Sequence, residues 1–137
     1  MKQINLFEPN LSYLEKKFVL ESLKKNQISS YGYFNDLLEK EVKKVTDSKY
    51  NLTISSGSAG LYIALKSTGI KKDEIVITQS YTFSATTNAI MLNNSIPLLV
   101  DISYNDLNID FENLKNFFNK ETFSKKNSTY HKKTKKK

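Results

Sequence analysis

The residues with the clearest chemical potential form a run of small side chains, Ser55-Ser56-Gly57-Ser58-Ala59. A turn of hydroxyl and glycine residues at the start of a helix leaves backbone N–H groups unpaired at a partly positive helix end. Such a turn binds anions, most often a phosphate group. The stretch from Asn51 to Leu61 is equally compatible with an ordinary helix that a serine caps. These residues alone leave both interpretations open.

The elements around this turn alternate between strand and helix. Residues 50–54 favour a strand, and the helix that follows runs from Ala59 towards Gly69, a residue type that commonly ends helices. Further along, the pattern predicts two buried strands and two helices: strands 74–78 and 96–100, helices 83–92 and 111–118. This alternation predicts an α/β domain with parallel strands and right-handed crossovers.

In such a sheet, ligands bind beyond the carboxyl ends of the strands. Three turns are expected there, at residues 55–58, 79–83 and 101–104.

Before the first strand we expect an extended segment over residues 4–11. Two helices should follow it, one through Lys25 with a Ser12–Glu15 capping box and one over about 34–45. We therefore divide the chain into an N-terminal arm with two helices (1–49), a partial α/β domain (50–119) and a tail (120–137).

Charge is unevenly distributed along the 137 residues. The tail holds eight of the 21 lysines and one acid, whereas residues 1–119 hold equal numbers of lysines and acids. A neutral body argues against specific nucleic-acid binding, which needs a basic face on the folded domain. The tail has no apolar periodicity, so we expect it to be disordered. The chain has no arginine for bidentate phosphate contacts.

Other site classes are excluded by composition. There is no cysteine, and the single histidine, His131, lies in the tail, so we expect no metal site. No apolar run reaches the roughly 20 residues that cross a bilayer, and the N-terminus lacks a signal-peptide core. These features favour the cytoplasm and predict no membrane association.

Several blocks, taken in order and at their spacing, resemble the DegT/DnrJ/StrS family of pyridoxal-phosphate-dependent sugar-nucleotide aminotransferases. The resemblance spans about residues 4–119, which correspond to the first third of a family member. Each block alone is weak evidence, and their combination is strong. The blocks are residues 8–10, 29–32 before Leu38-Glu39, 55–61, 73–77, 81–90 and 97–102.

The resemblance implies roles for individual residues. Gly57, Ser58 and Ala59 match the motif that holds the phosphate of the cofactor, pyridoxal 5′-phosphate (PLP), and Phe83 matches the aromatic residue that stacks on its ring. A segment near the sugar-nucleotide substrate is matched by Ser30, Tyr31 and Gly32. Gly60 stands where the family usually has alanine, and it should weaken the helix by ~1 kcal/mol.

The implied fold is the N-terminal part of the large domain of fold type I PLP-dependent transferases. In that domain the strand matched by residues 50–54 lies at one edge of a mixed, mostly parallel sheet, and the next two strands lie near the other edge. The strands between them come from later sequence, so we expect an incomplete sheet with flanking helices, exposed apolar faces and poor solubility.

The lysine that forms the Schiff base in the family, and the aspartate that pairs with the ring nitrogen, have no counterpart here. A lysine in an unpacked tail keeps a high pKa and is a poor nucleophile. We therefore expect no catalytic residue in this chain and no activity of its own. Lys132 to Lys135 resemble the segment that precedes the next strand in the family, which favours a truncated or frameshifted reading frame over a genuine basic tail.

Three alternatives remain open. The chain could derive from a PLP-dependent sugar dehydratase of the same family, which the N-terminal motifs do not distinguish from an aminotransferase. It could be a small non-enzymatic protein that binds polyanions through its lysines. Another polypeptide could supply the missing part, since family enzymes are usually homodimers. The family substrates are a keto-sugar nucleotide and, as amino donor, glutamate.

Overall fold

A computed structural model describes residue 5 and residues 7–137 of the chain. The described chain forms two compact units, one ending at Thr53 and the other spanning Ile54–Lys137. Each is considered by itself. Of the segment predicted to be extended, Ile4 lies outside the described residues, and residues 7–12 have no regular structure.

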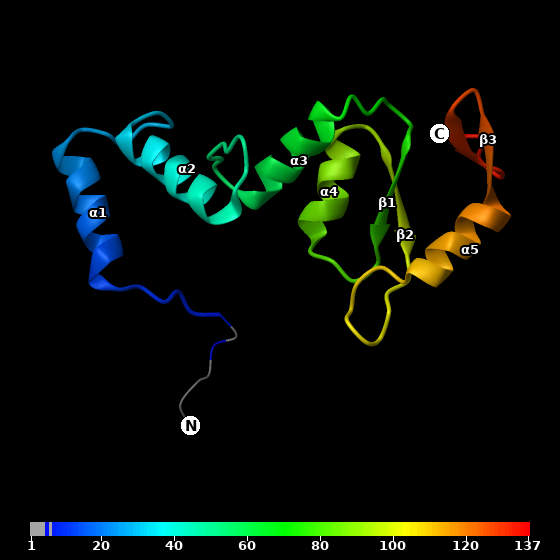
Figure 1. Ribbon diagram of the computed structural model, residues 1–137, viewed down its shortest axis with the longest axis horizontal. Helices are drawn as coiled ribbons and strands as arrows, with labels where there is room; N and C mark the ends of the chain where they lie inside the picture. Colours follow the sequence, from blue (N-terminus) through cyan, green and yellow to red (C-terminus); the bar gives the residue numbers. More distant parts are fainter. Residues whose placement is uncertain (1–4, 6) are drawn as a thin grey trace. The chain divides into compact units, whose positions relative to one another are not determined.

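The first unit contains two helices, α1 (Tyr13–Lys24) and α2 (Tyr33–Thr46), close to their predicted positions (Figure 1). The predicted capping box at the start of α1 is confirmed. The Ser12 hydroxyl accepts a hydrogen bond from the Leu14 N–H at 3.1 Å, and the Ser12 N–H donates to the Glu15 carboxylate at 2.7 Å. Hydrogen bonds from the Ser12 hydroxyl, and from the backbone N–H groups of Glu15 and Ser12, favour the ionised carboxylate and hold the pKa of Glu15 below its usual value.

The strand predicted over residues 50–54 does not form. Residues 51–54 are irregular, and the Thr53 N–H and hydroxyl bind the Glu39 carboxylate at 2.6 and 3.0 Å. A strand is stable only when a neighbouring strand satisfies its backbone groups. In the described part of the chain no such neighbour pairs with residues 50–54, and a side chain of α2 takes that role at Thr53.

The second unit is built around two parallel strands, β1 (Ile75–Gln79) and β2 (Ile96–Val100), paired from Ile75↔Ile96 to Gln79↔Val100. Helix α3 (Gly57–Ser67) precedes β1, and α4 (Ser84–Leu92) makes the crossover between the strands. Helix α5 (Phe111–Glu121) follows β2. The predicted α/β class, with a partial parallel sheet and flanking helices, is confirmed.

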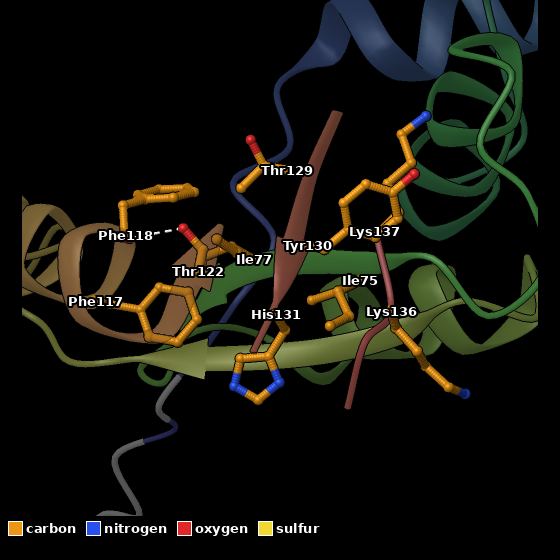
Figure 2. Close-up of a pocket in the computed structure, with 10 residues that line it drawn as sticks. All are labelled: Ile75, Ile77, Phe117, Phe118, Thr122, Thr129, Tyr130, His131, Lys136 and Lys137. Carbon is orange, nitrogen blue, oxygen red and sulfur yellow. Dashed lines mark hydrogen bonds between the residues drawn. The ribbon is translucent and has the colours of Figure 1, made fainter. Parts of the chain in front are cut away.

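The two faces of this small sheet are covered by different elements. Val76 and Thr78 lie with side chains of α3 and α4 around an apolar cavity of about 310 Å³. Ile75 and Ile77 contribute to a second cavity together with α5 and the C-terminal segment (Figure 2). Among the described residues only Ala89 and Ile90 are buried apolar side chains, so the predicted exposed apolar surface is present. Poor solubility remains a prediction.

The prediction of a disordered tail is wrong in this structure. Residues 122–131 form an antiparallel hairpin, β3 (Thr122–Lys125) and β4 (Ser128–His131). Its two-residue turn has positive φ at both Lys126 and Asn127, the geometry of a type I′ turn. Across the strands, Phe123 stacks on Tyr130 with ring centroids 5.6 Å apart. Such an aromatic pair across the two strands stabilises a hairpin. The sequence did not predict it, because strands of four residues with one aromatic residue each are too short to show an apolar periodicity.

Candidate anion-binding site

The start of α3 presents free backbone donors. Ser56 is the N-cap residue, and its hydroxyl accepts from the Ala59 N–H at 3.2 Å while its carbonyl accepts from the Gly60 N–H at 3.0 Å. In the part of the chain that the structure describes, the Gly57 and Ser58 N–H groups have no hydrogen-bond partner. Both residues are exposed. Two adjacent N–H groups at a partly positive helix end can therefore bind an anion.

This arrangement differs in one respect from the roles implied by the family. Ala59 was expected to donate its N–H to the phosphate, but the Ser56 hydroxyl occupies it here. Ser56 thus orients the turn and was not singled out as a site residue. Its position immediately before a helix start is the sequence signal of a capping serine.

Gly57 has no structural reason to lack a side chain. Its φ is not positive, and a Cβ atom added there meets no other atom within 4 Å. A side chain at this position would stand beside the free N–H group of the same residue and would restrict access to it. Nothing in the described structure itself therefore restricts residue 57 to glycine.

Gly60 has a packing partner. A Cβ atom added there would clash with the Cδ1 atom of Ile54, the residue two before the N-cap. Ile54 is 45% exposed, so its side chain can move aside at some expense in packing. The glycine that replaces the usual alanine of the family is thus matched to an isoleucine lying against the first turn of α3.

We expect Gly60→Ala to be nearly neutral in the natural sequence, because the helix-propensity gain of ~1 kcal/mol is offset by displacement of Ile54. In an Ile54→Ala background the same substitution should raise the free energy of unfolding by about that full amount. Denaturant titration followed by circular dichroism measures both differences. Equal effects in the two backgrounds would contradict the contact.

Phe83 lies at the start of the neighbouring helix. It is the N-cap residue of α4 with extended backbone dihedrals (φ −67°, ψ 141°), and its side chain is 81% exposed. In Figure 1, α4 begins near the end of the sheet where β1 and β2 finish, whereas the start of α3 lies away from that end. The start of α4, with the flat apolar ring of Phe83, therefore lies at the carboxyl edge of the strands.

The third predicted turn lies at the same edge but around a separate hollow. Ser80 and the segment after β2 line a polar cavity of about 600 Å³, with Asp101, Tyr104 and the α5 cap residue Asp110 among its walls. Asp110 is committed to capping, since its carboxylate accepts from the Glu112 and Asn113 N–H groups at 3.0 Å. Residues of the 55–58 turn do not line this cavity.

The residues expected near the substrate, Ser30, Tyr31 and Gly32, belong to the first unit and form the turn between α1 and α2. Gly32 has a φ of 153°, which restricts the position to glycine, and it precedes the first residue of α2. The Tyr31 ring is 82% exposed, and the Ser30 carbonyl accepts from the Asn35 amide at 2.7 Å. The turn therefore displays the aromatic side chain of Tyr31.

Lys66, the lysine of α3, is not poised as a nucleophile. Its ammonium group donates to the Tyr62 hydroxyl at 3.0 Å, and this hydrogen bond raises the pKa of Lys66. A protonated amine has no lone pair for attack on a carbonyl. Within the described ranges no cluster of three potential metal ligands occurs, and no helix is long and apolar enough to cross a membrane.

Comparison with known proteins identifies the family of the chain. Residues 9–127 match the model of the DegT/DnrJ/EryC1/StrS aminotransferase family. The chain belongs to this family. The matched region includes the α3 turn and Phe83, and the cofactor of the family is PLP.

Individual DegT-family relatives give the same result. The chain is 29% identical over 119 residues to GDP-perosamine synthase of Vibrio cholerae, covering 87% of the chain and 32% of the relative. It is 34% identical over 101 residues to GDP-perosamine synthase of Escherichia coli O157:H7, covering 74% and 28%. The chain thus spans about three-tenths of the length of these relatives.

Solved structures of the family share the fold. Escherichia coli GDP-4-keto-6-deoxy-D-mannose-3-dehydratase, solved with bound hydrated PLP, superimposes with a TM-score of 0.76 at 26% identity, covering 85% of this chain and 31% of that one. A second structure is that of the sugar aminotransferase Spr1654 of Streptococcus pneumoniae in its pyridoxamine phosphate form. It superimposes with a TM-score of 0.77 at 22% identity, covering 84% of this chain and 29% of that one, and supports the fold alone. The predicted large-domain fold is therefore confirmed over the matched region.

Proposed function

We propose that this chain contributes the cofactor-phosphate cradle and ring platform of a PLP-dependent enzyme that transfers an amino group to a keto-sugar nucleotide. One observation carries the proposal: in the described part of the chain, Gly57 and Ser58 offer two unpartnered N–H groups at the start of α3, where no protein atom lies within 4 Å of a Cβ atom placed on Gly57. Family membership supports the phosphate of PLP as the anion that this site holds.

Each site residue has a distinct part in this proposal. The Gly57 and Ser58 N–H groups bind the phosphate, the Ser58 hydroxyl adds a donor, and Ala59 with the Ser56 hydroxyl keeps the turn in shape. Phe83 supports the ring through its flat face. When bound, PLP supplies the electron sink that amino-group transfer requires. Ser30, Tyr31 and Gly32 contact the sugar nucleotide.

The relatives support the substrate class. The two described above are GDP-perosamine synthases, which favours a nucleotide-linked sugar as acceptor. The proposal takes glutamate as the amino donor and a homodimer as the active form. The dehydratase among the structural neighbours shares the fold and the cofactor. Dehydration of the same substrate class therefore stays the second candidate.

We further propose that this chain does not transfer amino groups by itself. No lysine in it stands in the family motif of the Schiff-base residue, and Lys66 is held protonated by Tyr62. Polyanion binding through the tail is less well supported, because three of its lysines have partners within the chain: Lys132 with the Lys120 carbonyl, Lys136 with Asp73 and Lys137 with Glu74.

The cradle is tested by titrating the full chain with pyridoxamine 5′-phosphate, a form of the cofactor that cannot form a Schiff base with surface lysines. We expect it to bind more tightly than pyridoxamine, which lacks the phosphate, and to be displaced by inorganic phosphate. Isothermal titration calorimetry measures all three affinities. Equal binding of the two amines would refute the phosphate site.

A further inference from the structure

The ring of Phe83, the proposed platform for the cofactor ring, is held in place by its backbone. Its side chain is 81% exposed, so few neighbouring side chains fix its orientation. A platform binds a flat ligand most tightly when it already lies in the binding position, because ordering it on binding costs free energy. The residues that fix the backbone around Phe83 should therefore affect how tightly the cofactor ring is bound.

On its C-terminal side, Phe83 is attached to the first turn of α4. Its carbonyl accepts a hydrogen bond from the Thr86 N–H at 3.0 Å, and the hydroxyls of Thr82 and Thr86 form a hydrogen bond at 3.0 Å. These bonds fix Phe83 relative to α4. They do not connect it to the sheet.

On its N-terminal side, two hydrogen bonds order the turn after β1. The Ser80 N–H donates to the Val100 carbonyl at 2.9 Å and extends the pairing with β2. One residue further, the Tyr81 carbonyl accepts from the side-chain amide of Gln79 at 2.6 Å. In the described part of the chain, this carbonyl accepts no other hydrogen bond. The Gln79 amide therefore forms the last hydrogen bond between the sheet and the segment that carries Phe83.

Gln79 is suited to this role by its place and its chemistry. It is the last residue of β1, where pairing with Val100 fixes its backbone. Its side chain is half-buried, whereas residues 80–83 are exposed. A carbonyl oxygen can only accept a hydrogen bond, so the contact needs the NH₂ group of glutamine, which an apolar or acidic side chain lacks. Donor and acceptor are two residues apart, so the bond is local to the turn.

We propose that Gln79 is a positioning residue of the cofactor site. Its amide holds the Tyr81 carbonyl and thereby keeps Phe83 in the position from which the ring supports the cofactor. This role rests on the proposed function of Phe83. Gln79 lies between the family blocks at 73–77 and 81–90, so the resemblance assigns it no part. It does not contact the cofactor, and it acts through Phe83.

The first test needs no ligand and uses Gln79→Met in the full chain, which keeps the length of the side chain and removes the donor. The N–H order parameters of residues 81–83, measured by nitrogen-15 relaxation, should fall from about 0.85 towards about 0.6. Thr87→Val is the matched control, because it removes a side-chain hydrogen bond to the Ser84 carbonyl inside α4. It should leave these values unchanged. Unchanged values in Gln79→Met would overturn the proposal.

The second test measures binding by calorimetric titration. Gln79→Met should lower the affinity for pyridoxamine 5′-phosphate about three- to five-fold, within the contribution of one hydrogen bond, and leave that for inorganic phosphate unchanged. Thr87→Val should change neither affinity. In a Phe83→Ala background, Gln79→Met should have no further effect, because the ring through which it acts is absent. A parallel loss of phosphate affinity, or an equal effect with and without the ring, would overturn the proposal.

The results also distinguish this role from the proposed function. Equal binding of pyridoxamine 5′-phosphate and pyridoxamine by the natural sequence would refute the phosphate site, and the order parameters would still show whether Gln79 holds the turn. If Phe83→Ala weakens binding and Gln79→Met does not, Phe83 remains the platform and the role of Gln79 is refuted. Should far-UV circular dichroism show that Gln79→Met is unfolded, Gln79→Val, which favours a strand and also lacks the donor, takes its place in both tests.

Discussion

Replacing Gly57 by valine is expected to lower the affinity of the chain for pyridoxamine 5′-phosphate by about ten- to a hundred-fold. The branched side chain would cover the Gly57 and Ser58 N–H groups, and losing even one hydrogen bond to a charged oxygen removes ~1.5–3 kcal/mol. Inorganic phosphate should lose affinity as well, since it uses the same donors. Calorimetric titration with both ligands measures the effect.

The surroundings of Gly57 make this experiment easy to interpret. A Cβ atom there meets no protein atom within 4 Å, so the substitution should leave the melting curve close to that of the natural sequence. Ser67→Val places the same side chain at the other end of α3 and should leave both affinities unchanged. Unaltered phosphate binding in Gly57→Val would remove the start of α3 from the proposed site.

Substituting Phe83 by alanine should lower the affinity for pyridoxamine 5′-phosphate by about ten-fold, the equivalent of ~1.4 kcal/mol of ring contact. Inorganic phosphate has no ring to stack, so its affinity should not change. The side chain is 81% exposed and makes no cap hydrogen bond, so stability should be little affected. Paired titrations with the two ligands make the measurement.

Phe83→Tyr is the conservative partner, because it keeps the flat face and should keep the affinity. A parallel loss of phosphate and cofactor affinity in Phe83→Ala would mean that the residue shapes the α4 start and does not contact the ring. Gly57→Val lowers both affinities and Phe83→Ala only one. The two variants therefore separate the phosphate contact from the ring contact.

Local features of this protein were predictable from sequence because their causes lie within a few residues. The capping box of α1 needs only Ser12 and Glu15, and both of its hydrogen bonds are present. The strand predicted at 96–100 is β2, and that at 74–78 is β1 displaced by one residue. Membership of the DegT family was also predictable, since it depends on the order of short motifs.

The errors concern segments whose structure depends on distant partners. Residues 50–54 have β-favouring side chains, yet the Thr53 N–H bonds to Glu39 because no neighbouring strand pairs with them. The tail has the composition of a disordered segment, yet it folds because Phe123 meets Tyr130 and because Lys126 and Asn127 adopt a tight turn. Amino-acid composition alone predicts neither the bond between Thr53 and Glu39 nor the contact between Phe123 and Tyr130.

By itself, the sequence determined the helix starts, the parallel strand pair, the family and the small residues of the α3 turn. Only the tertiary structure decided that Ser56 occupies the Ala59 N–H, that Gly60 faces Ile54, and that Lys136 and Lys137 bind beside β1. The physical reason is the range of the interactions. In caps and turns, the backbone groups form hydrogen bonds with residues a few positions away in the chain. At strand edges, the backbone groups form hydrogen bonds with whichever residues the tertiary fold places beside them. For the α3 turn, the residues alone left an anion site and a capped helix open and the family resemblance favoured the anion site, whereas the structure shows which N–H groups the Ser56 cap leaves free, those of Gly57 and Ser58.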